Sequence, residues 1–217
     1  FESCASGGGR FDPGLLYYTP QGWISDDTDA AERVRIQYGT SMCYPISSMG
    51  SHVSVVPNHQ LNRITSLHTR ANVAYFGTFG YELDLNKLTD EEIAEVKAQI
   101  IFMKEYRELI QFGNFYRLKS PFDGNETVWM TVSEDKRKAL VFWYRERNVV
   151  NAEFTRVRLQ GLDPDLIYKN EYNGTENYGD ELMNLGLLTT DVTAGEPTNE
   201  DLPCTDYESR IYVLTAE

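Results

Sequence analysis

The acidic segment Ser25-Asp26-Asp27-Thr28-Asp29 holds the carboxyl groups whose positions are most suggestive of chemistry. It follows a strand-like run that ends near Trp23, and it leads into a helical pattern in which Asp29 and Glu32 have the spacing of a capping box. Because Asp29 can cap the helix, the Asp26 side chain is free for other work, and free carboxyl groups are common general acids and bases. The alternative is an acidic loop rich in capping residues, since acidic residues are frequent ahead of helices.

A second candidate is the motif Cys4-x-x-Gly7-x-Gly9-Arg10, at the end of the first strand-like run. Glycines at a strand end let the backbone approach a ligand closely. The alternative is a flexible glycine turn beside a buried, inert Cys4. A phosphate-binding loop fits less well, because no Gly-Lys-Ser/Thr follows. Arg10 could orient Asp26 or another active-site carboxylate, or it could form a structural ion pair with Asp12.

The elements that position both motifs alternate between strand-like and helical runs from Phe1 to about Gly113, which is typical of βα units around a parallel sheet. Four such units can be drawn, and they amount to half of an eight-stranded barrel. In such barrels the residues that do chemistry lie where strands end. The first two predicted strands end near the glycines at 7–9 and near Trp23–Ser25, and the third and fourth cover about 44–56 and 78–85. The predicted helices cover about 29–38, 62–75 and 89–113.

Beyond residue 113 the hydrophobic period changes to two, which predicts a separate antiparallel β domain. Trp129, Trp143 and the tyrosines of this region could form a carbohydrate-binding platform, but alternating aromatic residues in strands are usually core, and we expect core packing. The predicted strands are 127–132, 139–145, 154–159, 166–171 and 210–215.

Composition narrows the possible partners. The chain has 217 residues and 33 acidic against 20 basic side chains, for a net charge of −13. This charge repels phosphate backbones and anionic lipids, so nucleic-acid and membrane-surface functions are disfavoured and a neutral substrate is easier to reconcile with it. No apolar run is long enough to span a membrane, and no signal peptide is visible at Phe1.

Neither the cysteines nor the histidines indicate a metal site. Cys4, Cys43 and Cys204 are odd in number and widely spaced, which argues against a disulfide framework or a structural zinc site and favours a reducing compartment. The three histidines lie on different segments without ligand spacing, so structural or supporting roles are expected; they are His52, His59 and His68.

The two opening motifs together resemble the catalytic half of glycoside hydrolase family 36. Similarity continues through most of the chain and is weakest from about Ser133 to Asn170. The further similar segments are Ile36-Gln-Tyr-Gly-Thr-Ser41, Ser47–His52, Val55-Val-Pro-Asn-His59, Phe79–Leu85 and Tyr178–Leu187.

The resemblance implies a retaining α-galactosidase that releases terminal non-reducing α-D-galactose from melibiose and raffinose-type oligosaccharides without metal or cofactor. By position, Asp26 would be the general acid/base, Cys4 and Gly7 would line the galactose pocket, and Arg10 would lie beside them. Retaining hydrolysis needs two carboxyl groups about 5 Å apart. The family's nucleophile lies upstream in a Lys-Trp-Asp-like context, which nothing between Phe1 and Glu217 matches.

The fold expected from the resemblance is therefore α/β plus all-β. Residues 1–113 would be the C-terminal half of a (β/α)8 TIM barrel, and residues 114–217 an antiparallel β-sandwich domain. The chain starts at Phe1 inside a strand-like run and without Met. We therefore expect a fragment, inactive alone, whose N-terminal part supplies the nucleophile within a cytoplasmic homotetramer.

Two other functions stay open at this point. One is an α-galactosyl transferase resembling raffinose or stachyose synthase, in which a sugar hydroxyl replaces water in the second step. The other is a non-catalytic carbohydrate-binding fragment. The sequence leaves the aglycone preference undecided.

Overall fold

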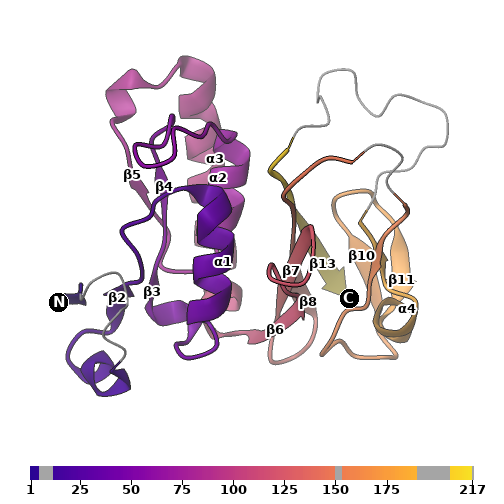
Figure 1. Cartoon of the computed structure of the whole chain (residues 1–217). Helices are drawn as coiled ribbons and strands as arrows, with labels where there is room; N and C mark the ends of the chain where they lie inside the picture. Colours follow the sequence, from indigo (N-terminus) through magenta and orange to yellow (C-terminus); the bar gives the residue numbers. More distant parts are fainter. Residues whose placement is uncertain (5–11, 150–152, 190–205, 217) are drawn as a thin grey trace. The chain divides into compact units, whose positions relative to one another are not determined.

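The chain folds into two compact units, Phe1–Phe112 and Gly113–Glu217. The structure is a computed structural model that describes residues 1–4, 12–149, 153–189 and 206–216 (Figure 1).

Short parallel strands organise the first unit. β1 (Glu2–Ser3), β2 (Gln21–Trp23) and β3 (Met49–Gly50) form one parallel sheet, and β4 (His52–Ser54) pairs in parallel with β5 (Gly80–Glu82). Ser51 alone separates β3 from β4, and its hydroxyl donates a 2.6 Å hydrogen bond to the Ala74 carbonyl. The prediction of parallel strands is confirmed, although each strand is shorter than its hydrophobic run.

The α-helices of this unit follow the strands and lie together on one side of them in Figure 1. The buried side chains of this unit include Val34, Val53 and Phe76. The predicted helix 62–75 begins later than expected, because Ser66 caps α2 by accepting a 3.0 Å hydrogen bond from the Thr69 amide. The helical elements are η1 (Pro13–Tyr17), α1 (Ala30–Thr40), η2 (Ile46–Ser48), α2 (Leu67–Ala74), η3 (Leu85–Lys87) and α3 (Asp90–Phe112).

A reciprocal capping box starts α3, as its sequence predicts. The Glu92 amide donates to Thr89 Oγ1 at 3.2 Å, and the Thr89 amide donates to Glu92 Oε2 at 2.9 Å. Replacing Thr89 with Ala should therefore cost about 1 kcal/mol of unfolding free energy, measured by urea unfolding. Thr89→Ser keeps the hydroxyl and should stay close to the parent. Equal losses for both variants would contradict a capping function.

The second unit is built on a six-stranded antiparallel sheet in the order β11-β10-β13-β8-β7-β6. β9 (Arg156–Val157) and β12 (Leu187–Leu188) form a separate antiparallel pair, and α4 covers Gly179–Asn184. The strands of the large sheet are β6 (Asn114–Lys119), β7 (Glu126–Val132), β8 (Lys138–Arg145), β10 (Ile167–Asn170), β11 (Glu176–Tyr178) and β13 (Glu208–Ala216).

The antiparallel β domain is thus confirmed, and its core joins the sheet to a smaller second layer. Val128, Val141 and Trp143 pack in one buried cluster with Val157 of β9 and Leu182 of α4. The second layer is this short pair and helix, where the sequence predicts a full sandwich. Trp129 and Trp143 are each 1% exposed, so the expectation that they are core residues is confirmed.

Candidate active site

Asp26 lies in the loop between β2 and α1, and its side chain is exposed. The cap of α1 is Asp29, whose carboxylate accepts a 3.1 Å hydrogen bond from the Glu32 amide, as predicted. Asp26 Oδ1 instead accepts a 3.2 Å hydrogen bond from the Trp23 indole N–H. The Asp26 carboxylate is therefore oriented by the end of a strand and takes no part in capping the helix.

The neighbouring acidic side chains hold the loop in place. Asp27 Oδ1 accepts the Asp29 amide at 3.0 Å, and the Asp29 carboxylate forms an ion pair with Arg63. Asn58 Nδ2 donates to Thr28 Oγ1 at 3.1 Å, which ties this loop to the loop after β4. Asp27 and Asp29 thus stabilise the conformation of the loop. Of the three carboxylates, that of Asp26 is the one that accepts a hydrogen bond from Trp23 at the end of β2.

An aromatic and ionic arrangement lies behind Asp26. The Trp23 ring stacks on the His52 ring, with centroids 4.4 Å apart and planes 7° from parallel. His52 Nε2 lies 2.8 Å from Glu82 Oε2, and the two residues begin β4 and end β5 respectively. Side chains of β4 and β5 thus help to fix the orientation of the β2 indole that donates to Asp26.

Arg33 of α1 is the buried cation of this region, with 2% of its surface exposed. Its guanidinium donates to the Ser25 carbonyl at 2.7 Å and to the Gly50 carbonyl at 3.4 Å, and it lies 5.8 Å from the centre of the Trp23 ring. Burial lowers the pKa of Arg33 to about 10, against the opposing fields of Asp27, Glu82 and Asp26. The side chain is therefore charged at neutral pH and joins the end of β2 to β3.

The stacked His52 is neutral at neutral pH. Burial first, and the Arg33 charge second, lower the pKa of His52 to about 4 from an ordinary value of 6.5. Glu82 favours the protonated ring, but its side chain is 54% exposed and water weakens its field.

This shift predicts a loss of stability in acid. Below pH 6.5 the unfolded chain protonates His52 while the folded chain does not, so stability falls as the pH drops from about 6.5 to about 4. Relative to a His52→Gln variant, the chain should lose about 2 kcal/mol of unfolding free energy between pH 7 and pH 4.5. Urea unfolding across this range measures the difference, and parallel pH profiles for the two proteins would refute it.

Of the motif Cys4-x-x-Gly7-x-Gly9-Arg10, the structure describes only Cys4. Cys4 directly follows β1, and its side chain is exposed as a free thiol. The parallel register pairs Ser3 with Gly22, so Cys4 and Trp23 both lie one residue further along, at the carboxyl ends of adjacent strands. Cys4 is thus on the same end of the sheet as the loop of Asp26. Gly7 and Arg10 lie outside the described residues.

Metal-ligand and membrane-spanning features are lacking in the described part of the chain. Its residues contain no group of three or more His, Cys, Asp and Glu side chains that could hold a metal ion. None of the helices it describes is long and apolar enough to cross a membrane.

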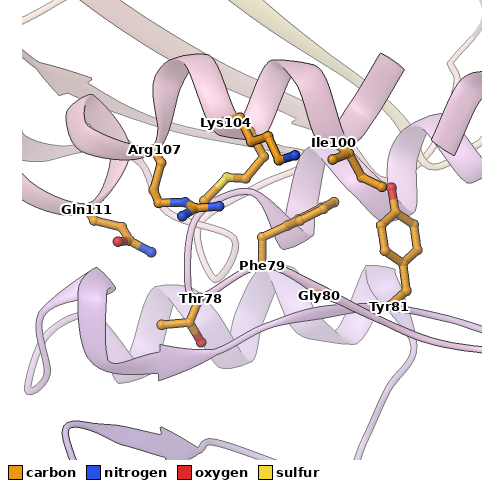
Figure 2. A pocket seen from close by; sticks show the side chains of 9 residues that line it. Thr78, Phe79, Gly80, Tyr81, Ile100, Lys104, Arg107 and Gln111 are labelled. Carbon is orange, nitrogen blue, oxygen red and sulfur yellow. The ribbon is translucent and has the colours of Figure 1, made fainter. Parts of the chain in front are cut away.

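A separate hollow of about 400 Å³ lies between β5 and α3. Figure 2 shows Lys104 and Arg107 extending from α3 toward the Phe79 ring, with Tyr81 at the other end of the hollow. The Tyr81 hydroxyl donates to Gln99 Oε1 at 2.8 Å. Among the described residues β4 is the only strand that pairs with β5, so β5 lies at the edge of its sheet.

Two family models match the chain, one in each unit. Residues 1–113 match the Melibiase model, and residues 126–214 match the glycosyl hydrolase family 36 C-terminal domain. The chain belongs to the melibiases of glycoside hydrolase family 36. The resemblance inferred from the two opening motifs is therefore confirmed, and this family-36 chain carries both the melibiase segment and the C-terminal domain.

Characterised relatives of this family-36 chain are longer. Alpha-galactosidase AgaA of Geobacillus stearothermophilus is 57% identical over 187 residues, which are 86% of this chain and 26% of AgaA. The bifunctional alpha-galactosidase/sucrose kinase AgaSK of Mediterraneibacter gnavus is 50% identical over 86% of this chain and 20% of its own length. The chain thus spans about a quarter or less of these relatives.

Solved structures match over the entire chain. The crystal structure of AgaA superposes with a TM-score of 0.91 at 51% identity and covers 100% of this chain and 29% of AgaA. Variants of AgaA have been solved in complex with raffinose and with 1-deoxygalactonojirimycin, at the same TM-score of 0.91.

Proposed function

We propose that this chain is the C-terminal portion of a retaining α-galactosidase and that Asp26 is its general acid/base. The observation that carries the proposal is a carboxylate at the end of a parallel strand, oriented by Trp23 and spared from capping, in a chain whose two units both match family 36. The substrates would be terminal α-D-galactosides such as melibiose and raffinose-type oligosaccharides.

The reaction proceeds in two displacements. In the first, a carboxylate outside this chain attacks the anomeric carbon while Asp26 gives its proton to the departing glycosidic oxygen. In the second, Asp26 takes a proton from water, whose oxygen attacks the same carbon and releases the nucleophile, so the configuration is retained. The Trp23 N–H keeps the carboxyl directed during both steps, and the residues need no metal or cofactor.

The remainder of the enzyme would complete a (β/α)8 barrel around this site. The parallel strands follow one another in chain order, and β1 and β5 each have one side without a strand partner among the described residues. An open parallel edge favours pairing with a further strand. The missing part would pair with these edges, bury the hollow between β5 and α3, and bring the nucleophile opposite Asp26. Cys4, Gly7 and Arg10 would contact the galactosyl ring.

The cellular setting is part of the same proposal. Cys4 and Cys43 are exposed free thiols, which persist best in a reducing compartment, so we place the enzyme in the cytoplasm. The complete enzyme would assemble as a homotetramer.

A chimera tests the function. This chain replaces the matching segment of Geobacillus AgaA, which supplies the rest of the polypeptide, and proton NMR follows the hydrolysis of melibiose and raffinose. Galactose released first as the α anomer is the expected result. Release of the β anomer, or a folded chimera without activity, would contradict the proposal. Added sucrose serves as an acceptor, and predominant transfer to it would show a transferase instead.

A further inference from the structure

The β domain contains a second hollow, of about 560 Å³, between the β6–β7 hairpin and the segment after β8. It is lined by residues of the second unit, among them Lys119, Asp123, Glu126, Arg145 and Glu153. A volume of this size lies within the range of small-molecule sites. None of its lining residues belongs to the loop of Asp26, and the proposed reaction does not involve this hollow.

The floor of this hollow is a preorganised polar network centred on Glu126. Its Oε2 lies 2.5 Å from Lys119 Nζ, and its Oε1 accepts hydrogen bonds from the Trp143 indole at 3.1 Å and from the Thr155 hydroxyl at 3.0 Å. Arg145 forms an ion pair with Glu208 and lies 5.4 Å from the centre of the Trp143 ring. The floor is thus held rigidly by side chains from several strands.

Some polar groups around the hollow lack partners. Arg145 is 9% exposed, and its buried Nε has no hydrogen-bond partner. At the rim, Asp123 and Glu153 are exposed carboxylates, and neither has a hydrogen-bond partner within the described part of the chain. The Asp123 and Glu153 carboxylates are therefore unused acceptors in the lining of the hollow.

The charges identify the kind of ligand. The lining holds two cations, Lys119 and Arg145, and three carboxylates, Asp123, Glu126 and Glu153. The rim carboxylates would repel a phosphate, and the described residues contain no group of three or more His, Cys, Asp and Glu side chains that could hold a metal ion. A hydroxyl both donates and accepts, so a polyhydroxylated neutral ligand can use acceptors and donors in the same hollow.

Apolar surface beside the polar groups fits the C–H faces of sugar rings. Leu118 and Val149 line the hollow and supply apolar surface for such a face. We propose that this hollow is a non-catalytic binding site for neutral oligosaccharides on the C-terminal β domain.

Titration calorimetry with raffinose tests the site, in the full chain and in the AgaA chimera. Saturating 1-deoxygalactonojirimycin is present throughout, so that the active site is occupied. A residual binding event of millimolar affinity is expected. The double variant Asp123→Ala/Glu153→Ala removes two charged acceptors and should weaken this event about tenfold or more. Melibiose hydrolysis by the chimera should be unchanged.

A second variant blocks the space without removing charge. A Cβ built at Gly124, which lines the hollow, meets no atom within 4 Å, so Gly124→Trp can be accommodated and should also abolish the residual binding. Asp165→Trp, at an exposed turn of the same unit, is the matched control and should bind like the parent. Absence of residual binding, or residual binding that both hollow variants retain, would overturn the proposal. Either result is independent of whether the chimera hydrolyses galactosides.

Discussion

Replacing Asp26 with Ala in the chimera is expected to slow raffinose hydrolysis by about 10³-fold, because the departing sugar oxygen then leaves without a proton. An aryl α-galactoside with a strongly acidic phenol needs little protonation, so its first step should be slowed far less. The burst of phenol release and the steady-state rates with both substrates measure this contrast.

Asp27→Asn is the matched control for this experiment. It removes a charge from the adjacent residue and keeps the Oδ1 that accepts the Asp29 amide. Raffinose hydrolysis should then fall by less than about tenfold, since proton transfer itself is untouched. Equal losses with the two kinds of substrate in Asp26→Ala, or a larger loss in Asp27→Asn, would contradict the assignment.

Replacing Arg33 with Met should have the largest effect on the stability of the first unit. The variant leaves the Ser25 and Gly50 carbonyls without their hydrogen-bond donor. It also removes the buried positive charge near three carboxylates, those of Asp26, Asp27 and Glu82. We expect a loss of about 3 kcal/mol of unfolding free energy, measured by urea unfolding. Hydrolysis of activated and natural substrates should fall together, because the loop of Asp26 loses its anchor.

Arg33→Lys separates charge from geometry. A lysine keeps the positive charge, but its single ammonium group cannot reproduce the planar fork that reaches two carbonyls. It should recover only part of the stability. Lys97→Met, at an exposed position of α3, removes one positive charge elsewhere and should be within about 0.5 kcal/mol of the parent. A stable Arg33→Met chimera with full activity would show that the loop is positioned in another way.

Local rules predict the parts of the fold that depend on neighbouring residues. The Asp29 cap, the Thr89 box and the period-two strands around Val128 and Val141 are each specified within a few positions. These rules do not predict where α2 begins, and they do not predict the strand β6. The turn at Asn58 delays α2, since Asn58 Oδ1 accepts two backbone amides, and β6 is recruited by pairing with β7.

The surroundings of Asp26 could be predicted only in part. The sequence identifies Asp26 because Asp29, three residues further on, caps the helix. It also predicts a structural or supporting function for His52. The stack of Trp23 on His52, the approach of Glu82 to His52 and the two carbonyls held by Arg33 join residues that are 8 to 30 positions apart in the sequence. Such contacts depend on the order of the parallel strands, which no local pattern encodes.

The most direct test of Asp26 as acid/base is azide rescue of Asp26→Ala in the chimera, with an activated aryl α-galactoside as substrate. The upstream nucleophile would still form a β-linked galactosyl-enzyme, and azide, which needs no general base, would then attack it. We expect accelerated turnover and α-galactosyl azide as the product, identified by NMR. If azide gave β-galactosyl azide, Asp26 would be the nucleophile instead, and if azide gave no rescue, Asp26 would not be the acid/base.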